Sequence, residues 1–394
     1  MEKNNKTLNV PHLRFPEFSG EWERCTIGDI TRNFSLRNKD KIQYPMFSVT
    51  NSRGFVPQSE QFEDREMIGE DIKAYKIIHE GDFAYNPARI NVGSIAKYDK
   101  SEPCMISSLY VCFKALPQIN NEWLMQLLKT PKMNFYYNVN GEGGVRVYLF
   151  YPNFARIRTS YPSLAEQQKI AGFLSLLDQR IETQRKIIED LKKLKDAICN
   201  MNFTSGSALK LGNVGKFVRG LTYSASDVID DTMGTAVMRS NNISNGDPAN
   251  FEELIWVNKT PNHEQILRGG DIIICMANGS SPLVGKASYY IDCGMESATV
   301  GAFCGIYRSY NPLTKWLFQS KHYKKHIQRC IQGGNGAIAN IYPEDILAIS
   351  FNIPSGYERV LNTLNSLEDK YLLEQKLLCR YLTVKSHLLA QLFI

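Results

Sequence analysis

The sequence predicts an α+β protein in which two similar mixed α/β domains are separated by two long antiparallel coiled-coil helices. A long amphipathic segment that begins LSLLDQRIETQRKII at Leu174 recurs as LNSLEDKYLLEQKLL at Leu364, 190 positions later. Each copy follows a stretch of short strand-like runs and turns rich in Gly, Asn and Ser. Because a duplication of this length indicates two copies of one unit, we expect an internal pseudo-twofold repeat.

Shorter motifs also repeat, and their order is the same in both halves. The offsets between partners drift from 184 to 193, as small insertions in loops would cause. The pairs are Ile27-Gly28-Asp29-Ile30 with Leu211-Gly212-Asn213-Val214, Glu80-Gly81-Asp82 with Gly269-Gly270-Asp271, Trp123-Leu124-Met125-Gln126 with Trp316-Leu317-Phe318-Gln319, Tyr151-Pro152 with Tyr342-Pro343, and Pro162-Ser163 with Pro354-Ser355.

The repeat divides the chain into five segments. We expect an N-terminal segment 1–19, a first globular domain 20–161, a central spacer helix 162–203, a second globular domain 204–353 and a C-terminal spacer helix 354–394. Strand-like runs in the globular domains cover residues 82–85, 107–113, 271–276 and 299–307, and one helix in each domain is expected near Trp123 or Trp316.

Each long helix carries a heptad seam of apolar residues, whose spacing alternates between three and four as in coiled coils. Polar residues interrupt the seam at Gln184 and Lys195 in the first copy, and at Glu374 and Lys385 in the second. The main seam residues are Leu174, Leu177, Ile181, Ile188, Leu191, Leu364, Leu367, Tyr371, Leu378 and Tyr381.

A lone heptad helix is more often an oligomerisation element or part of a core than a spacer. Here one chain supplies two matched helices, which favours an antiparallel pair within the molecule. Ser163 with Glu166, and Ser355 with Glu358, have the spacing of an N-terminal capping box. A helix of about 40 residues would be roughly 60 Å long.

Composition sets broad limits. With 394 residues, 43% hydrophobic and 22% charged, the chain reads as a soluble globular protein of two or three domains. Its net charge of +6 permits a polyanionic partner. Nine cysteines without a C-x-x-C pair read as reduced thiols, which favours the cytoplasm over a disulfide framework or a zinc site. No apolar run approaches the roughly 20 residues of a membrane span.

The chain lacks recognisable catalytic motifs. Adenine methylation uses a short Asn/Asp-Pro-Pro-aromatic loop to hold a flipped base, and residues 86–89 read only Asn-Pro-Ala-Arg. Residues 279–287 resemble a phosphate loop superficially, but the glycine spacing is one residue too long and Ala287 has no hydroxyl for Mg²⁺. The six histidines are scattered. The sequence therefore predicts no catalytic residues and no cofactor or metal site in this chain.

The repeated motifs resemble those of the specificity subunit of type I restriction-modification systems. The resemblance is carried by PHLRFPEFSGEWE at residues 11–23, the two Tyr-Pro pairs, PSLAEQ at 162–167 and LLDQRIETQRK on the first helix. It is strongest over residues 151–203 and weakest inside the globular domains. The second copy departs from the pattern, because residues 354–359 read PSGYER. Its contacts with a modification subunit are therefore expected to differ in detail.

The resemblance implies a role for each part. Each globular domain would be a target recognition domain for one half of a bipartite sequence in double-stranded DNA, and the helices would hold the two domains at a set distance. The chain would recruit two modification subunits, which methylate adenine N6 with S-adenosylmethionine. It would also recruit restriction subunits, which use ATP and Mg²⁺ to translocate and cut DNA. These cofactors are expected on the partners.

DNA reading places amides and guanidinium groups on loops beside base edges. Arg can hold guanine O6 and N7, and Asn adenine N6 and N7, each pair discriminating by about 1–3 kcal/mol. Polar loops occur at equivalent places, 85–91 and 141–146 in the first domain and 276–281 and 333–340 in the second. For any single residue the alternative is a solvated turn, which needs the same Gly and Asn. The candidates are Arg32, Arg37, Lys39, Asn86, Arg89, Asn91, Arg146, Arg239, Asn241, Asn278, Ser280, Lys286, Asn335 and Asn340.

Two other functions compete with DNA recognition. A duplicated-domain coiled-coil scaffold that binds only proteins is compatible with the modest charge. A self-contained DNA methyltransferase is disfavoured, because both of its catalytic motifs are missing. The first helix has seven Lys or Arg against six Asp or Glu over residues 162–203. This balance is typical of a spacer and docking surface rather than of a nucleic-acid groove.

Overall fold

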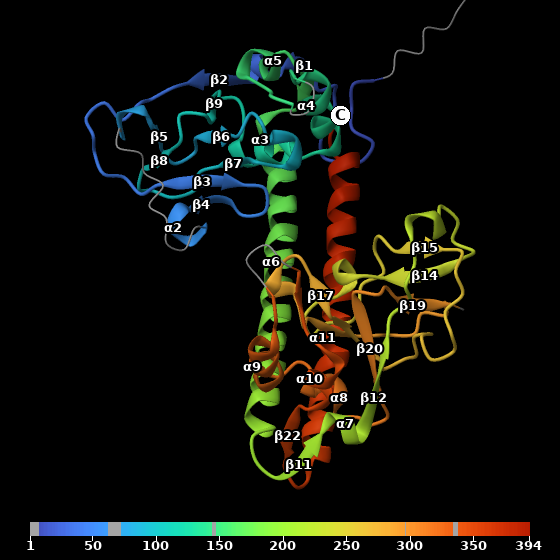
Figure 1. The fold of residues 1–394 in the computed structure, drawn as a ribbon. Helices are drawn as coiled ribbons and strands as arrows, with labels where there is room; N and C mark the ends of the chain where they lie inside the picture. The colour runs from blue at the N-terminus through green and yellow to red at the C-terminus, as the bar shows by residue number, and fades with distance from the viewer. Residues whose placement is uncertain (1–7, 62–71, 144–146, 296, 334–337) are drawn as a thin grey trace, which may run out of the picture. The chain divides into compact units, whose positions relative to one another are not determined.

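The computed structural model describes residues 8–61, 72–143, 147–295, 297–333 and 338–394. The chain forms two compact units, and Figure 1 labels their elements where there is room. Unit 1 contains the chain up to Arg185 together with Lys376–Ile394, and unit 2 is the intervening stretch Lys186–Gln375. Unit 2 is therefore continuous in sequence, whereas unit 1 is assembled from two separate stretches.

Two long helices each contribute to both units. They are α6, Leu164–Asn202, and α11, Tyr357–Gln391, and both lie where the heptad seams predict them. The seam residues are shielded from solvent: Leu174, Ile181, Leu364 and Tyr371 are buried, and Leu177, Ile188, Leu191, Leu367, Leu378 and Tyr381 are half-buried.

Within each unit, the segments of α6 and α11 lie side by side (Figure 1). In unit 1, Asp178 of α6 forms an ion pair with Lys385 of α11. Two residues further along α6, Arg180 Nε donates to the hydroxyl of Tyr381 at 3.0 Å. Positions rise along one helix as they fall along the other, so the two helices are antiparallel, as predicted.

The polar break at Lys195 is the centre of a buried network in unit 2. Lys195 of α6 forms an ion pair with Glu368 of α11, and their side chains are only 2% and 3% exposed. The hydroxyl of Tyr289 donates to the same carboxylate, and burial followed by this bond raises the pKa of Tyr289. The Lys195 ammonium also lies 4.1 Å from the centre of the Tyr371 ring. This polar contact defines one register of the helices within a mostly apolar seam.

The polar break at Lys385 plays the equivalent part in unit 1. Its partner Asp178 also accepts a hydrogen bond from Gln126 Nε2 at 2.9 Å. Lys195 and Lys385 are 190 positions apart, and so are Asp178 and Glu368. The same ion pair is therefore built twice, with the two helices exchanging roles. The unit 1 copy is the more exposed, since the Asp178 side chain is 40% accessible.

Unit 1 is built on an antiparallel sheet in the order β2-β9-β6-β7, with the strand pairs β1-β10, β3-β4 and β5-β8 beside it. Its elements are β1 (Glu23–Thr26), α1 (Ile27–Ile30), β2 (Thr31–Phe34), β3 (Phe47–Thr50), β4 (Gly54–Pro57), α2 (Gln58–Gln61), the 3-10 turn Ile72–Ala74, β5 (Lys76–Ile78), β6 (Phe83–Tyr85), the 3-10 turn Ile90–Val92, β7 (Ile95–Lys97), β8 (Cys104–Ile106), β9 (Val111–Ala115), α3 (Asn121–Leu128), α4 (Pro131–Asn140), α5 (Tyr151–Ala155) and β10 (Arg158–Tyr161).

Unit 2 has an antiparallel sheet in the order β12-β20-β16-β18 and a second sheet in the order β13-β15-β14-β19. Its elements are β11 (Ser207–Lys210), α7 (Leu211–Val214), β12 (Gly215–Arg219), the 3-10 turn Ala225–Asp227, β13 (Val228–Ile229), β14 (Thr235–Met238), the 3-10 turn Ser240–Asn242, β15 (Ile255–Val257), β16 (Ile272–Cys275), β17 (Ala277–Asn278), the 3-10 turn Ser281–Leu283, β18 (Ala287–Tyr289), β19 (Ala298–Val300), β20 (Cys304–Ser309), α8 (Thr314–Leu317), α9 (Lys321–Cys330), β21 (Ala339–Asn340), α10 (Pro343–Leu347) and β22 (Ser350–Ile353).

The strand orders confirm the internal repeat. The sheet β2-β9-β6-β7 corresponds strand by strand to β12-β20-β16-β18, and every neighbouring pair is antiparallel in both. The pair β1-β10 corresponds to β11-β22. The units differ beside this shared frame. Unit 2 adds a four-stranded sheet that includes the parallel pair β14–β19, where the described part of unit 1 has two separate strand pairs.

Two predicted strand runs are wrong in extent. The run 107–113 is a strand only from Val111, because Ser107 starts a turn in which its carbonyl accepts the amide of Tyr110 at 3.2 Å. The run 299–307 is split between β19 and β20. A second turn separates them, in which the Gly301 carbonyl accepts the amide of Cys304 at 2.8 Å. In both places apolar residues on either side of a tight turn read as one strand.

The repeated Gly-Asp motif forms the same turn in both units. Gly81 and Gly270 have φ values of 84° and 89°, a left-handed conformation that favours glycine. The carboxylate of Asp82 or Asp271 then accepts the backbone amide three residues earlier, at 2.9 Å in unit 1 and 2.8 Å in unit 2.

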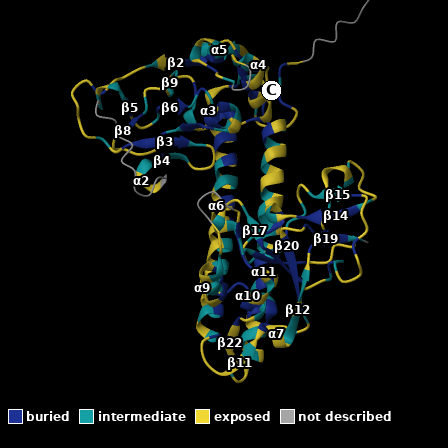
Figure 2. Ribbon diagram, in the orientation of Figure 1, coloured by how far each residue is buried: buried dark blue, intermediate teal, exposed yellow. Residues whose placement is uncertain are grey.

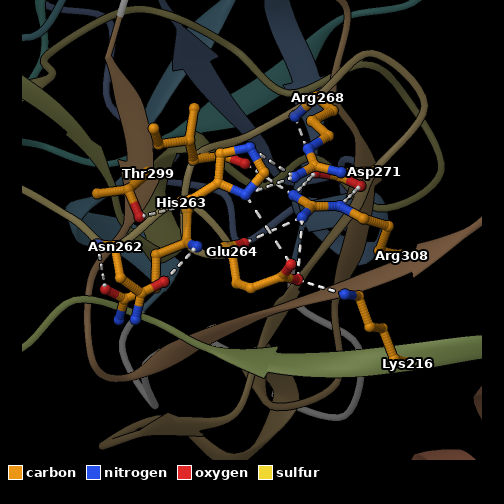
Figure 3. A network of polar contacts seen from close by, with 10 residues as sticks. Lys216, Asn262, His263, Glu264, Arg268, Asp271, Thr299 and Arg308 are labelled. Atoms are coloured by element: carbon orange, nitrogen blue, oxygen red, sulfur yellow. Dashed lines mark hydrogen bonds and ion pairs between the residues drawn. The ribbon is translucent and has the colours of Figure 1, made fainter.

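Each of these aspartates also forms an ion pair with a basic residue of the neighbouring strand, β9 in unit 1 and β20 in unit 2. In unit 1, Lys114 Nζ lies 3.2 Å from Asp82. In unit 2, Arg308 donates two bonds to Asp271, at 2.8 and 2.6 Å (Figure 3). Arg308 is 5% exposed and also donates to two carbonyls of the loop 264–266, at 3.1 and 2.7 Å. The buried guanidinium therefore ties this loop to the sheet.

The opening motif is attached to the start of α6. Arg14 donates two bonds to the carboxylate of Glu166, at 2.8 and 2.7 Å, and Trp22 Nε1 donates a third at 3.2 Å. The predicted capping box is therefore half right. The Ser163 hydroxyl accepts the amide of Glu166 at 3.4 Å, but the buried carboxylate binds the opening segment instead of the backbone.

The second predicted capping box is wrong. Helix α11 begins at Tyr357, so Ser355 does not directly precede its first turn. Gly356, with a φ of 72°, lies between them, and Glu358 is exposed. Where PSGYER replaces the PSLAEQ pattern, the long helix therefore begins later and lacks the serine cap.

The core of unit 1 includes residues from near the end of the chain. The ring of Phe393 lies 5.8 Å from that of Trp123 and 6.4 Å from that of Trp22. Leu389 and Leu392 are buried in the same cluster. In Figure 2 the sheet strands of both units are largely buried, whereas α6 and α11 show long exposed sides.

We expect Lys195→Met to lower the free energy of unfolding by about 3–5 kcal/mol, because it leaves the carboxylate of Glu368 buried without its ammonium partner. The matched variant Lys385→Met removes the equivalent but more exposed pair and should cost less than about 1 kcal/mol. Urea denaturation measures both losses. Equal losses would show that burial of the unit 2 pair adds nothing to stability.

Arg308→Met should destabilise unit 2 by about 3–5 kcal/mol, because Asp271 stays buried and two loop carbonyls lose their donor. Lys114→Met, which removes an exposed lysine from the equivalent place, should cost about 1 kcal/mol or less. Hydrogen exchange locates the effect, with faster exchange in the loop 262–271 of the Arg308 variant. Unchanged exchange in that loop would contradict the anchoring role.

Candidate nucleic-acid interface

In unit 1, the first polar loop lies against α4 and the segment that follows it, in which the second polar loop was predicted. The first follows β6 and the second follows α4. Leu149 donates its amide to the carbonyl of Pro87 at 3.0 Å, and Asn91 Nδ2 donates to Asn138 Oδ1 of α4 at 3.0 Å. The second loop is closed by reciprocal backbone bonds between Glu142 and Tyr148, at 2.8 and 2.7 Å.

Unit 2 joins its two loops in the same places. Ala277 and Asn278 form β17, which pairs with β21 of the second loop. Ile341 donates its amide to the carbonyl of Met276 at 2.9 Å, and the second loop is closed by reciprocal bonds between Gln332 and Asn340, both of 2.9 Å. In the described residues, each unit therefore presents one composite surface, made from its first polar loop and the segment that follows α4 or α9.

Two predicted asparagines shape these loops. Asn86 Oδ1 accepts the amide of Ala88 at 3.0 Å, and Asn278 Oδ1 accepts the amide of Ser280 at 2.9 Å. These are equivalent turns in the two units, in which an Asn side chain bonds the backbone two residues on. Asn278 Nδ2 also donates to Ser240 Oγ at 3.2 Å. Its carboxamide therefore holds the loops in place, which leaves it less capacity to bind a base.

A cavity of about 650 Å³ opens on the composite surface of unit 2. Three predicted residues line it, Arg239, Asn241 and Asn278, and they come from two loops that are far apart in sequence. Arg239 and Asn241 are exposed and Asn278 is half-buried. A guanidinium and a carboxamide that face solvent in one hollow can bind the edges of bases.

Other residues of this cavity were missed by the sequence argument. Tyr223, Glu253 and Phe303 also line it, and Phe303 is 65% exposed. Glu253 was missed because a single carboxylate in a polar stretch has no periodicity or motif. In unit 1, Asn51 in the loop after β3 lies close to Gly93, which follows the first polar loop. Only the folded structure brings these residues close to the predicted loops.

The remaining candidates lie at separate positions. Arg32 is exposed on the edge strand β2, and Arg37 and Lys39 are exposed in the loop that follows it. Arg89 is exposed in the first loop of unit 1. In unit 2, Ser280 is exposed and Lys286 and Asn340 are half-buried, and none of the three lines the cavity. Arg146 and Asn335 lie outside the described residues.

Two thiols lie next to each other beside the cavity of unit 2, and one of them lines it. Cys275 and Cys304 face each other across β16 and β20, and Cys304 lines the cavity. The hydrogen bond between the thiols lowers the pKa of Cys275 and, together with burial, raises that of Cys304. The thiol that lines the cavity therefore stays protonated and offers no nucleophile.

Among the described residues, no group of His, Cys, Asp and Glu side chains is arranged to hold a metal ion. None of the described helices combines the length and the hydropathy of a membrane span.

Comparison with known proteins identifies the class of domain. The family model of the type I restriction modification DNA specificity domain matches residues 19–193. This stretch is similar to that family, and the resemblance drawn from the sequence is confirmed.

Two curated relatives are type I restriction enzyme specificity subunits. The EcoKI specificity subunit of Escherichia coli (strain K12) is 30% identical over 156 residues, which are 36% of this chain and 32% of the relative. The StySPI specificity subunit of Salmonella potsdam is 31% identical over 158 residues, which are 37% of this chain and 32% of the relative. The chain thus matches about a third of the length of these relatives.

Solved structures share the fold over nearly the whole chain. The type I restriction-modification system S subunit from M. genitalium has a TM-score of 0.55 and 14% identity, with 98% of this chain and 99% of that chain covered. A chain from a study of complex assembly and conformational transition of the type I R-M system has a TM-score of 0.53 and 13% identity, with 96% and 98% covered. The fold of specificity subunits is therefore the fold of this chain.

Proposed function

We propose that this chain is the non-catalytic DNA sequence-recognition subunit of a type I restriction-modification complex. The observation that carries the proposal is the composite two-loop surface, which occurs once in each repeat on the same four-stranded frame. Two equivalent surfaces with different side chains suit a bipartite target, in which each unit reads one half-site of double-stranded DNA.

The helices α6 and α11 act as spacer and docking surface in this proposal. Several of their large apolar residues face solvent, among them Leu176 at 66% and Leu373 at 64% exposure. Leu194 and Val384, which are equivalent in the repeat, are 47% and 49% exposed. Exposed apolar residues on both helices, with one pair at equivalent positions of the repeat, favour protein partners that bind twice, and two modification subunits meet that requirement.

Chemistry is assigned to the partners. The modification subunits would supply S-adenosylmethionine and methylate adenine N6, and the restriction subunits would use ATP and Mg²⁺ to translocate and cleave DNA. This chain would then contribute target choice and geometry in the cytoplasm, with no catalytic group of its own.

Co-expression with the cognate modification subunit tests the proposal. We expect N6-methyladenine in the host DNA within one split motif. Replacement of residues 20–160 by those of another specificity subunit should change one half-site and leave the other intact. The scaffold alternative predicts no new modification by a partner that is active with another specificity subunit, and that result would overturn the proposal.

Insertion of one heptad into each of α6 and α11 should change the gap between the half-sites. The insertion adds about 10 Å of helix, the length of ~3 base pairs, and leaves both loop surfaces untouched. Methylation mapping should therefore report the same half-sites with a different spacing. New half-sites at an unchanged spacing would contradict the role of the helices.

A further inference from the structure

The cavity of unit 2 contains two opposite charges that are not paired. Arg239 follows β14 and Glu253 precedes β15, and both side chains line the cavity and are exposed. Neither forms an ion pair with another described residue, nor do they pair with each other. A guanidinium and a carboxylate held apart in one hollow leave a donor and an acceptor available to a third group.

The backbone holds Glu253 in an unusual conformation. Its φ is 53°, and the only other described residue besides glycine with a positive φ is Lys41. Side chains other than Gly and Asn disfavour this left-handed region, so the surrounding structure must impose it. Strained residues of this kind concentrate at functional sites, where the conformation directs a side chain.

A buried asparagine joins the two segments that carry the charges. Asn242 is 0% exposed. Its Oδ1 accepts the amide of Arg239 at 2.9 Å, and its Nδ2 donates to the carbonyl of Glu252 at 2.7 Å. Both bonds are made to the backbone at or next to a charged residue of the cavity. Asn242 is therefore a positioning residue, which fixes the separation of Arg239 and Glu253.

We infer that unit 2 reads a guanine–cytosine pair, with Arg239 on guanine and Glu253 on cytosine. The inference deepens the proposed function and rests on it. In the major groove, guanine presents two acceptors, O6 and N7, and cytosine presents the N4 amine as a donor. A guanidinium only donates and a carboxylate only accepts, so this pair of side chains matches both edges of one G·C pair.

An adenine–thymine pair matches the two side chains less well. Glu253 could accept from adenine N6, but thymine O4 offers Arg239 a single acceptor in place of two. The thymine methyl group would also face a charged side chain. The arrangement therefore selects G·C at this position, and Arg239 supplies the larger share of the selection through its two parallel bonds.

The test uses two variants that should change base discrimination without lowering the stability of the fold. Glu253→Gly removes the carboxylate and also relieves the positive φ, so its stability should not fall. Arg239→Met removes the guanidinium and keeps an extended side chain. Glu252→Gln is the matched control, because this neighbouring carboxylate does not line the cavity.

Each variant is combined with the modification subunit and a library of targets randomised in the half-site of unit 2. That half-site is the one left unchanged when residues 20–160 are exchanged. Methylation by the wild-type chain should require G·C at one position of this half-site. Glu253→Gly and Arg239→Met should each reduce the preference at that same position by roughly 5- to 150-fold. The Glu252→Gln control should keep it.

Three results would overturn the inference. Both variants could keep the full preference of the wild-type chain. They could lose the preference at two different positions of the half-site. The position at which they lose the preference could require A·T in the wild-type chain. In each of these cases a split methylation motif of the wild-type chain would still support the proposed function. Absence of any split motif, with an active modification subunit, would instead overturn the proposed function and this inference with it.

Discussion

The structure depends on one ion pair that occurs twice between its long helices. Lys195 with Glu368 in unit 2, and Lys385 with Asp178 in unit 1, set the antiparallel register where the apolar seam is interrupted. Leucine-rich seams tolerate shifts by a heptad, because one apolar layer packs much like the next. A buried lysine does not tolerate such a shift, since its carboxylate would be left unpaired. The globular parts attach directly to these contacts, through Tyr289 in unit 2 and Gln126 in unit 1.

The two units share their frame and differ on their surfaces. The shared part lies inside, in the order of the strands and in the Gly-Asp turns with their basic partners. The equivalent helices α4 and α9 show how far the surfaces diverge. Phe135 and Val139 of α4 are each 62% exposed, whereas the equivalent residues of α9 are the exposed Lys325 and Arg329. A frame held by internal contacts can therefore present different chemistry in each copy.

The sequence was sufficient where physical constraints repeat along the chain. Heptad spacing placed α6 and α11, and the ordered motifs placed the equivalent strands and turns. It was insufficient where a residue acts through a partner distant in sequence. Glu166 has the spacing of a cap but binds Arg14, and Glu253 and Arg239 line one cavity that only the folded chain creates. Asn278 was identified by its type, yet its carboxamide is engaged by neighbouring loops.

The packing of Phe393 between Trp22 and Trp123 orders events during synthesis. The ribosome synthesises the chain from its N-terminus. The aromatic core of unit 1 therefore cannot be completed until Phe393 has been synthesised, long after Trp22 and Trp123. The second unit, continuous in sequence, is complete earlier. We therefore expect unit 2 to fold first, although most of unit 1 is synthesised before it. A chain truncated before Phe393 should leave Trp22 and Trp123 without this packing partner and be removed by chaperones and proteases.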